Sequence, residues 1–267
     1  MKKNQINLKD YFVLKWQPLT SCNYNCSYCC QKNKTSLNVK NIINNSKLIK
    51  EKIANKIDNK ILLSISGGEI SIIPIKLLLS ILETLYNQNI KVVNITTNFF
   101  KEVDYYNTIY EWCKNHNILF FLDCSFHEEF ISEEVFFNKI KKLNFEPCQI
   151  QTVVTKNNYS YMNNLKERHS EIFFEPNIYD DLNDIKFNFT LNETARFKTR
   201  KTNPYFNKFC YQNEVSIKEN GDIYNNNCKQ IKYGNINNKL ILPNFPFSLK
   251  CKKENCPLCF IQINENS

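Results

Sequence analysis

Apolar runs of strand length alternate with amphipathic segments over about residues 12 to 177 of the chain. In the amphipathic segments, such as 74–87 and 133–143, apolar residues recur at the spacing of one helix face. The apolar runs between them are short enough to be strands. They cover residues 12–19, 61–66, 91–98, 119–126, 149–155 and 172–176.

Six such strand–helix units in series predict an α/β fold with a parallel sheet and crossover helices. Because the repeat is so regular, we expect a partial (β/α)6 TIM-like barrel rather than an open doubly wound sheet. In such folds the chemistry lies where strands end and helices begin.

After about residue 200 the pattern changes to short, cysteine-bearing segments with little helical periodicity. Asn220-Gly221 lies between the strand-like segments 214–219 and 222–225, which predicts a hairpin with a type I′ turn. We therefore expect two domains, a barrel core over residues 1–200 and a small cysteine-rich hairpin domain over residues 201–267.

Composition excludes several classes of protein. No run of about 18 uncharged apolar residues occurs, so we expect a cytoplasmic protein that spans no membrane. The formal net charge is +9, but the basic residues are mostly Lys dispersed among Asn and Ile. Because no block of about five or six basic residues is present, we expect no nucleic-acid partner.

The chain contains 12 cysteines and carries no secretion signal. Disulfides rarely persist in a reducing cytosol, so metal or cluster ligation is the expected use of these thiols. Cys113, Cys124 and Cys148 stand apart in strand-like or helical segments. There we expect free buried thiols that act as small apolar side chains.

Cys22, Cys26 and Cys29 form a CxxxCxxC pattern directly after the first predicted strand. Three thiolates on a short loop can bind three irons of a [4Fe–4S] cluster and leave the fourth iron open to an external ligand. Adjacent cysteines rarely reach two corners of one cluster, so we do not expect Cys30 to be a ligand. A zinc-binding loop is the alternative.

This loop, with Tyr28 before its third cysteine, resembles the CxxxCxΦC motif of the radical S-adenosylmethionine (radical SAM) superfamily. Ser66-Gly67-Gly68-Glu69, after the second strand, is similar to the GGE motif of that family. The resemblance implies that S-adenosylmethionine chelates the open iron and is cleaved by one electron to a 5′-deoxyadenosyl radical. It also implies a reductant such as flavodoxin or ferredoxin.

The same resemblance implies a set of cofactor-binding residues. Gly67, Gly68 and Glu69 would meet the methionine ammonium, because glycine allows close backbone approach and a carboxylate pairs with a cation. Thr97 and Asn98 are similar to the TxN strand endings that border the cofactor in this family. The other implied contacts are Tyr28 and, at the end of the fourth strand, Ser125.

His127, just beyond the fourth strand, is a candidate acid or base because its ordinary pKa lies near neutrality. A hydrogen-bonded structural histidine is the alternative. Val154, in the fifth strand, could pack near adenine, but packing in the core is the favoured interpretation.

The second group of cysteines has the spacing C-x17-C-x22-C-x4-C-x2-C. It resembles the SPASM and twitch extensions of radical SAM enzymes, with Gly221 and Gly234 at matching turns. This resemblance implies one auxiliary [4Fe–4S] cluster, with a structural zinc site as the alternative. The expected ligands, two of which would face each other across the hairpin, are Cys210, Cys228, Cys256 and Cys259, with Cys251 as an alternative.

The substrate is inferred from relatives of this architecture alone. A peptide that undergoes post-translational modification is favoured, and a sugar or aminocyclitol metabolite, dehydrogenated or epimerised, is second. Lys229 stands where maturase-like members carry an aspartate base, which argues against a maturase. A non-catalytic iron–sulfur or zinc scaffold is the alternative of another class.

Overall fold

The computed structural model describes residues 6–29, 31, 34–147, 149–155, 157–169, 174–178, 206–225 and 229–252. In this part of the chain, nine strands form one sheet in the order β10-β9-β8-β1-β2-β3-β4-β5-β6. Strands β1 to β6 stand in chain order, and every neighbouring pair among them is parallel. They are β1 Tyr11–Trp16, β2 Lys60–Ile65, β3 Ile90–Thr97, β4 Leu119–Phe126, β5 Gln149–Val154 and β6 Phe174–Ile178.

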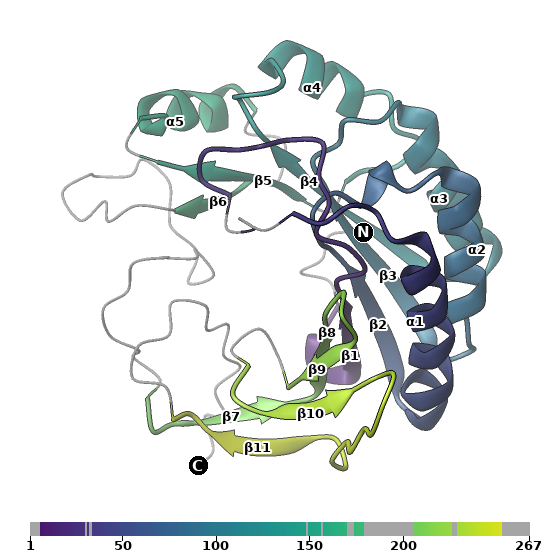
Figure 1. Cartoon of the computed structure of the whole chain (residues 1–267). Helices are drawn as coiled ribbons and strands as arrows, with labels where there is room; N and C mark the ends of the chain where they lie inside the picture. The colour runs from purple at the N-terminus through teal and green to yellow at the C-terminus, as the bar shows by residue number, and fades with distance from the viewer. Residues whose placement is uncertain are drawn as a thin grey trace.

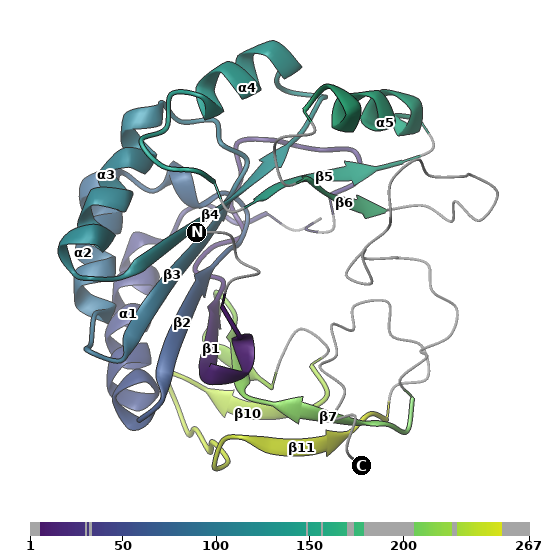
Figure 2. The same ribbon diagram turned by 180° about the vertical axis from the view of Figure 1, so that it is seen from behind.

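The sheet is curled, and the helices lie along its outer side (Figure 1 and, from behind, Figure 2). This arrangement confirms the predicted partial barrel, and the six expected strands are each found within a few residues. No helix in the described segments has the length and apolar character needed to cross a membrane. The helices are α1 Val39–Lys52, α2 Ile75–Leu85, α3 Val103–Asn115, α4 Glu133–Ile140 and α5 Tyr159–Arg168.

Strand β1 illustrates how the alternating pattern produces two different faces. Phe12, Leu14 and Trp16 are buried in the large core between sheet and helices. The intervening Val13 packs on a second, smaller cluster formed by Leu62, Val92 and Phe121. Because successive side chains of a strand point to opposite faces, this second cluster lies inside the curl, near the amino ends of the strands.

Polar side chains lie on the inner face above this apolar floor. Asn94 Nδ2 donates to Asp123 Oδ2 at 3.0 Å, and both side chains are buried. Lys15 Nζ lies 2.5 Å from Glu214 Oε2, between β1 and the neighbouring strand β8 (Glu214–Ile217). The interior of the curl is therefore apolar at the amino ends of the strands and polar toward their carboxyl ends.

The C-terminal hairpin continues the barrel sheet. β8 pairs in parallel with β1, and it forms the predicted hairpin with β9 (Asp222–Tyr224), which pairs with β10 (Lys232–Asn235). β7 (Phe209–Gln212) and β11 (Phe247–Lys250) form a separate two-stranded sheet. The domain boundary at residues 200 and 201 lies outside the described residues and stays a prediction.

The turn of this hairpin differs from the predicted type I′ turn. Lys218 N donates to Asp222 O at 2.9 Å, and Gly221 N donates to Lys218 O at 2.8 Å. Gly221 has a φ of +84°, whereas Asn220 keeps a negative φ. These features define a three-residue loop that ends in a left-handed glycine, so the type I′ prediction is wrong.

Other cysteine and core predictions can also be compared with the structure. Cys113 and Cys124 are fully buried free thiols, as expected, and Cys148 lies outside the described residues. Val154 is buried in the large core, which confirms its packing role.

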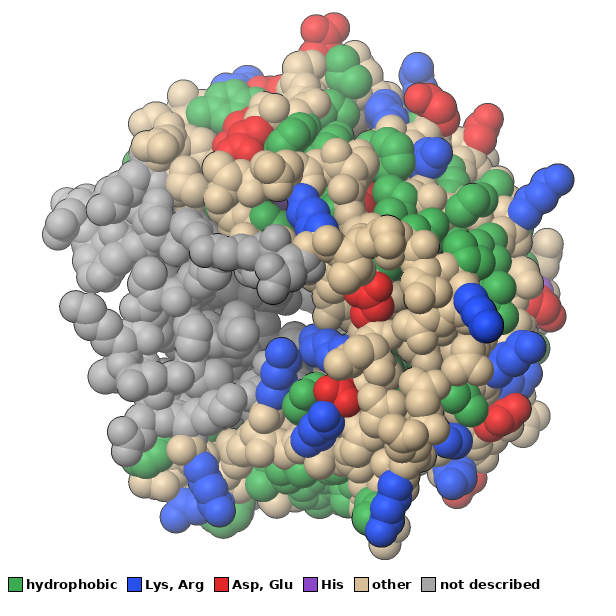
Figure 3. Space-filling view, in the orientation of Figure 1, with side chains coloured by type: hydrophobic (Ala, Val, Ile, Leu, Met, Phe, Trp, Pro, Cys, Tyr) green, Lys and Arg blue, Asp and Glu red, His purple; other side chains and the backbone are tan. Residues whose placement is uncertain are grey.

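In Figure 3, Lys and Arg side chains are spread over the described part of one face among Asp and Glu, without a continuous basic stripe there.

Candidate active site at the carboxyl edge of the sheet

The cysteine loop, defined as residues 17–38, leaves the carboxyl end of β1, arches over the sheet and enters α1 (Figure 1). Its thiols Cys22, Cys26 and Cys29 are half-buried. Burial, and to a lesser extent the charges of Cys29, Glu129 and Cys22, raises the pKa of the Cys26 thiol to about 11. The predicted ligands are thus close enough to influence one another.

This donor set fits an iron–sulfur cluster. As thiolates the side chains would repel one another and resist burial, and bound iron would compensate both effects. In the described part of the chain, no three His, Cys, Asp or Glu side chains are grouped so as to hold a single metal ion. Cys22, Cys26 and Cys29 are the residues that would hold the cluster.

Asn98, at the end of β3, reaches the cysteine loop. Its Nδ2 donates to Asn23 Oδ1 at 2.9 Å and lies 4.0 Å from Cys22 Sγ. Its backbone N–H donates to Glu69 Oε2 at 2.5 Å. The structure therefore brings this predicted residue between the first cysteine and the predicted acid.

Glu69 is only 1% exposed and connects β2 to β3. Its Oε1 accepts from Ser71 N at 2.8 Å, Ser71 Oγ at 2.6 Å and Thr97 Oγ1 at 2.6 Å. Burial raises the pKa of the Glu69 carboxyl, and the hydrogen bond from Asn98 N opposes the rise most strongly. In this structure the carboxylate fixes two strand ends, and its pairing with an ammonium stays a prediction.

Gly67 and Gly68 lie against the backbone that leads into the cysteine loop. A Cβ on Gly67 would stand 2.4 Å from Leu19 O, and one on Gly68 would stand 1.9 Å from Ser21 O. Gly68 N donates to Leu19 O at 3.0 Å, and Glu69 N donates to Ser21 O at 2.8 Å. The scarcity of glycine was a useful signal, because only glycine allows this approach.

His127 and Tyr28 join the end of β4 to the cysteine loop. His127 Nδ1 lies 2.9 Å from Tyr28 Oη and 3.6 Å from Cys26 Sγ, and the two rings are stacked. Burial lowers the pKa of His127 to about 4. This geometry is that of a hydrogen-bonded neutral histidine beside a cysteine, and an acid–base role stays a prediction. Ser125 is half-buried nearby on β4, and its contact with a cofactor also stays a prediction.

Two contacts of the loop tip were missed by sequence reasoning. Ser27 N donates to Glu129 Oε2 at 3.0 Å, and Tyr24 stacks on Phe130 with ring centroids 4.4 Å apart. These partners lie about a hundred residues apart in the chain, so no local sequence pattern predicts their contact. Their position just after β4 is the one signal that could have suggested a role.

Comparison with known proteins agrees with this geometry. A family model described as a 4Fe-4S single cluster domain matches residues 14–143. Native anSMEcpe with bound AdoMet is 14% identical, with a TM-score of 0.59 over 86% of this chain and 79% of that chain. This chain therefore shares the overall fold of this AdoMet-bound protein.

The same protein with bound AdoMet and the Cp18Cys peptide is 13% identical to this chain. Its TM-score is 0.60, over 86% of this chain and 78% of that chain. No sequence among the curated proteins matches significantly. The cysteine loop lies within the segment that matches the 4Fe-4S single cluster domain.

Two of the C-terminal cysteines, Cys210 and Cys251, belong to the described residues. β7, which carries Cys210, pairs with β11, and Cys210 stands opposite Leu249. Cys251 follows β11 and is 6% exposed, and its N–H extends the ladder by donating to Lys208 O at 2.9 Å. Alternation along the strand therefore places Cys251 on the same face as Leu249. Gln212 Nε2 lies 2.7 Å from Cys210 Sγ. Cys228, Cys256 and Cys259 lie outside the described residues, so the auxiliary ligand set stays a prediction.

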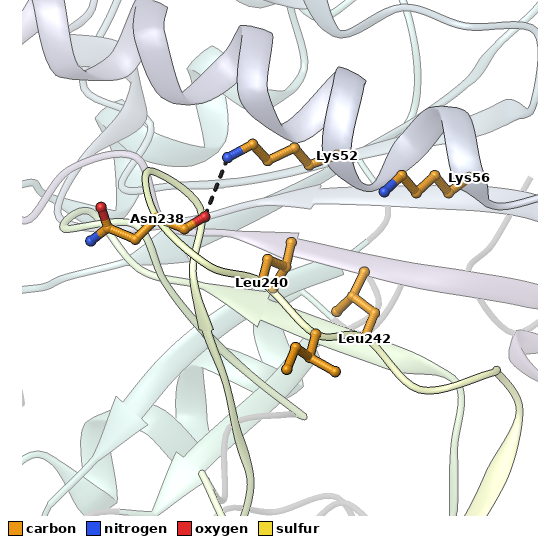
Figure 4. A pocket seen from close by; sticks show the side chains of 6 residues that line it. Lys52, Lys56, Asn238, Leu240 and Leu242 are labelled. Carbon is orange, nitrogen blue, oxygen red and sulfur yellow. Dashed lines mark hydrogen bonds between the residues drawn. The ribbon is translucent and has the colours of Figure 1, made fainter.

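A pocket of about 510 Å³ lies away from this site (Figure 4). It is bordered by the end of α1 and the segment that follows β10, where Lys52 Nζ donates to Asn238 O at 3.4 Å. Because the cysteine loop enters the opposite end of α1, this pocket is not part of the candidate site. Its lining residues are Lys52, Lys56, Asn238, Leu240, Ile241 and Leu242.

Proposed function

We propose that this chain is a radical SAM enzyme in which Cys22, Cys26 and Cys29 hold a [4Fe–4S] cluster that binds S-adenosylmethionine. The observation that carries the proposal is the position of the cysteine loop at the carboxyl edge of a curled parallel sheet, against Asn98 and His127. In α/β barrels, ligands bind and react at this edge. The loop thus brings three thiols to the edge that such folds use for chemistry.

When bound, a cluster with an open iron supplies the electron that cleaves S-adenosylmethionine, and the resulting 5′-deoxyadenosyl radical takes hydrogen from a substrate. The chain's own residues define where this happens. Asn98 orients the first cysteine through Asn23. Tyr28, which is 6% exposed, stacks on the half-buried His127, and this pair of rings covers one side of Cys26.

We favour a peptide that undergoes post-translational modification as the substrate. Support comes from the similar fold of anSMEcpe, which has a structure with AdoMet and the Cp18Cys peptide. The polar inner layer that contains Asn94 and Asp123 offers donors and acceptors to a polar substrate. A sugar or aminocyclitol metabolite could use the same groups and is the second candidate.

We also propose an auxiliary [4Fe–4S] cluster bound by C-terminal cysteines, with zinc as the alternative metal. Cys210 and Cys251 support it, because both project from one face of the β7–β11 ribbon. The cluster takes four ligands, so Cys251 is the alternative to one of the sequence-predicted ligands Cys210, Cys228, Cys256 and Cys259. A reductant such as flavodoxin or ferredoxin would supply electrons in the cytoplasm.

The test is anaerobic reconstitution of the full chain with iron and sulfide, followed by dithionite and S-adenosylmethionine. We expect 5′-deoxyadenosine from the wild type and from a Cys113→Ala control, whose thiol is buried far from the loop. We expect none from the Cys22→Ala/Cys26→Ala/Cys29→Ala variant. A reconstituted wild type that forms no 5′-deoxyadenosine would be a non-catalytic scaffold, contrary to the proposal.

Metal analysis of the same triple variant tests the auxiliary centre. About four irons per chain should remain if the C-terminal cysteines bind a second cubane cluster. A content of one zinc and no iron per chain would mean that the C-terminal cysteines form a structural zinc site rather than a cluster. Product analysis with candidate peptides and with aminocyclitols then separates the two substrate classes.

A further inference from the structure

We propose that Glu219, in the C-terminal hairpin, is a positioning residue that closes the neck of the cysteine loop. The neck is defined as Thr20 and Thr35, which flank the three cysteines. The inference rests on the proposed function, because its consequence is retention of the cluster. It assigns to the C-terminal segment a role in the N-terminal site.

The neck is closed by direct contacts between its two sides. Thr35 N donates to Thr20 Oγ1 at 3.2 Å, and Ser21 Oγ donates to Thr35 O. The chain therefore enters and leaves the cysteine loop at one point.

One carboxylate bridges both sides of the neck. Thr20 Oγ1 donates to Glu219 Oε2 at 2.8 Å, and Thr35 Oγ1 donates to Glu219 Oε1 at 2.8 Å. Hydrogen bonds from hydroxyls to a carboxylate are stronger than those between neutral groups. Because each oxygen of Glu219 accepts from a different side, the carboxylate opposes separation of the neck.

Glu219 itself is held in place by the helix that follows the loop. Its backbone oxygen accepts from Asn41 Nδ2 at 2.7 Å and from Asn45 Nδ2 at 3.1 Å. Both asparagines belong to α1, and Asn45 is 1% exposed. The hydrogen-bonded turn from Lys218 to Asp222 fixes the same residue from the hairpin side. The carboxylate is thus presented from a fixed backbone.

A closed neck favours cluster binding through chain entropy. Three thiols must converge on one cluster, and the loop loses conformational freedom when they do. If its ends are already joined, less freedom remains to be lost, and the cluster is released more slowly. Breaking the Glu219 bridge should therefore speed cluster loss and leave the barrel folded.

The test compares iron release to a chelator, under anaerobic conditions, from reconstituted full-length chains. Glu219→Gln keeps the side-chain size but replaces one acceptor oxygen by an amide donor, and Thr35→Val removes the hydroxyl from an exposed residue. Loss of a charge-assisted hydrogen bond predicts release about tenfold faster in either variant. Thr35→Ser, which keeps the hydroxyl, should restore the wild-type rate.

The matched control is Glu111→Gln, an exposed acid on α3 that pairs only with Lys114 among the described residues. A second readout is amide exchange of residues 21–29 in the iron-free chain, which should be faster in Glu219→Gln and unchanged in the control. The double variant Glu219→Gln/Thr35→Val should release iron at a rate within about twofold of either single variant, because the two changes remove one shared interaction.

The outcomes separate this inference from the proposed function. If Glu219→Gln and Thr35→Val release iron and exchange amides at the wild-type rates, the proposed role of the Glu219 bridge is overturned and the radical SAM proposal stands. A wild type that binds no cluster would overturn both. If Glu219→Gln unfolds, the comparison of Thr35→Val with Thr35→Ser decides alone.

Discussion

The phenolic oxygen of Tyr28 lies 2.9 Å from Nδ1 of His127, and the two rings are stacked with centroids 5.9 Å apart. Tyr28 precedes the third cysteine, and His127 follows β4 directly. The pair therefore connects the cysteine loop to a strand on the far side of β2 and β3. This link has two components, ring packing and a hydrogen bond, which substitutions can separate.

Ring packing is expected to contribute more to cluster retention than the hydrogen bond. Tyr28→Phe keeps the stack, so its iron content after desalting should be close to wild type. His127→Ala removes the ring beside Cys26 and should lose iron several-fold faster, since the loop then lacks packing on that side. His116→Ala, directly after α3, is the control. Equal iron losses in Tyr28→Phe and His127→Ala would mean that the Tyr28 hydroxyl, rather than ring packing, retains the cluster.

Gly68→Ala should prevent the native arrangement of the cysteine loop. The added Cβ would stand 1.9 Å from Ser21 O and 2.5 Å from Thr20 O, and both atoms belong to the backbone. Relief requires separation of the β2 turn from the loop, which we expect to cost about 3 kcal/mol or more. Urea denaturation and iron content measure both effects. Ser66→Ala, two residues earlier, is the control, and a Gly68→Ala variant with wild-type values would contradict the steric argument.

Local pattern was sufficient for much of the fold. Apolar runs of strand length placed β1 to β6 close to their observed bounds, and β1 to β5 bury apolar side chains in the core under the helices. The spacing of Cys22, Cys26 and Cys29 located the loop, and the two adjacent glycines located the turn against which it packs. These features depend on neighbours in sequence, which a single chain displays directly.

Long-range contacts were beyond the same reasoning. Glu219 meets Thr20 across 199 residues, and the parallel pairing of β8 with β1 is equally remote. The Asn-Gly dipeptide predicted a type I′ turn, but Asn41 and Asn45 fix the carbonyl of Glu219 within a three-residue loop. Local preference at Asn220-Gly221 favours a type I′ turn, whereas tertiary hydrogen bonds to Glu219 accompany the three-residue loop that is observed.

Lys139→Met should destabilise the turn that follows Asn98. Lys139 Nζ donates to three backbone oxygens, of Phe99 at 2.9 Å, Phe100 at 3.0 Å and Lys101 at 2.7 Å. Phe99 is buried with a φ of +59°, a region that non-glycine residues rarely occupy. Removing a charged donor should lower the free energy of unfolding by about 2 kcal/mol.

Urea denaturation at neutral pH measures this effect. Lys142→Met, an exposed lysine on the same segment, should leave the midpoint unchanged. Equal midpoints for Lys139→Met and Lys142→Met would show that the turn is stable without the ammonium.

Acid sensitivity is expected from the carboxylate of Glu133, which joins α4 to α5. Arg168 Nε donates to its Oε1 at 2.8 Å and Arg168 Nη2 to its Oε2 at 2.6 Å, while His169 Nε2 lies 2.9 Å from Oε1. The hydrogen bonds from Arg168 are the main reason that the pKa of Glu133 falls from 4.5 to about 2. Because the folded pKa is the lower one, the stabilisation is present above pH 4.5 and is lost as pH falls toward 2.

Glu133→Gln should therefore be less stable than wild type at pH 7 and approach it in acid. The side chain is 23% exposed, so solvent screening reduces the expected difference at pH 7 to about 1–2 kcal/mol. Urea midpoints at pH 7, 4 and 3 measure the change, and Glu134→Gln, an exposed neighbour, should follow wild type at each pH. A Glu133→Gln deficit that stays constant from pH 7 to pH 3 would mean that packing, rather than charge, fastens the two helices.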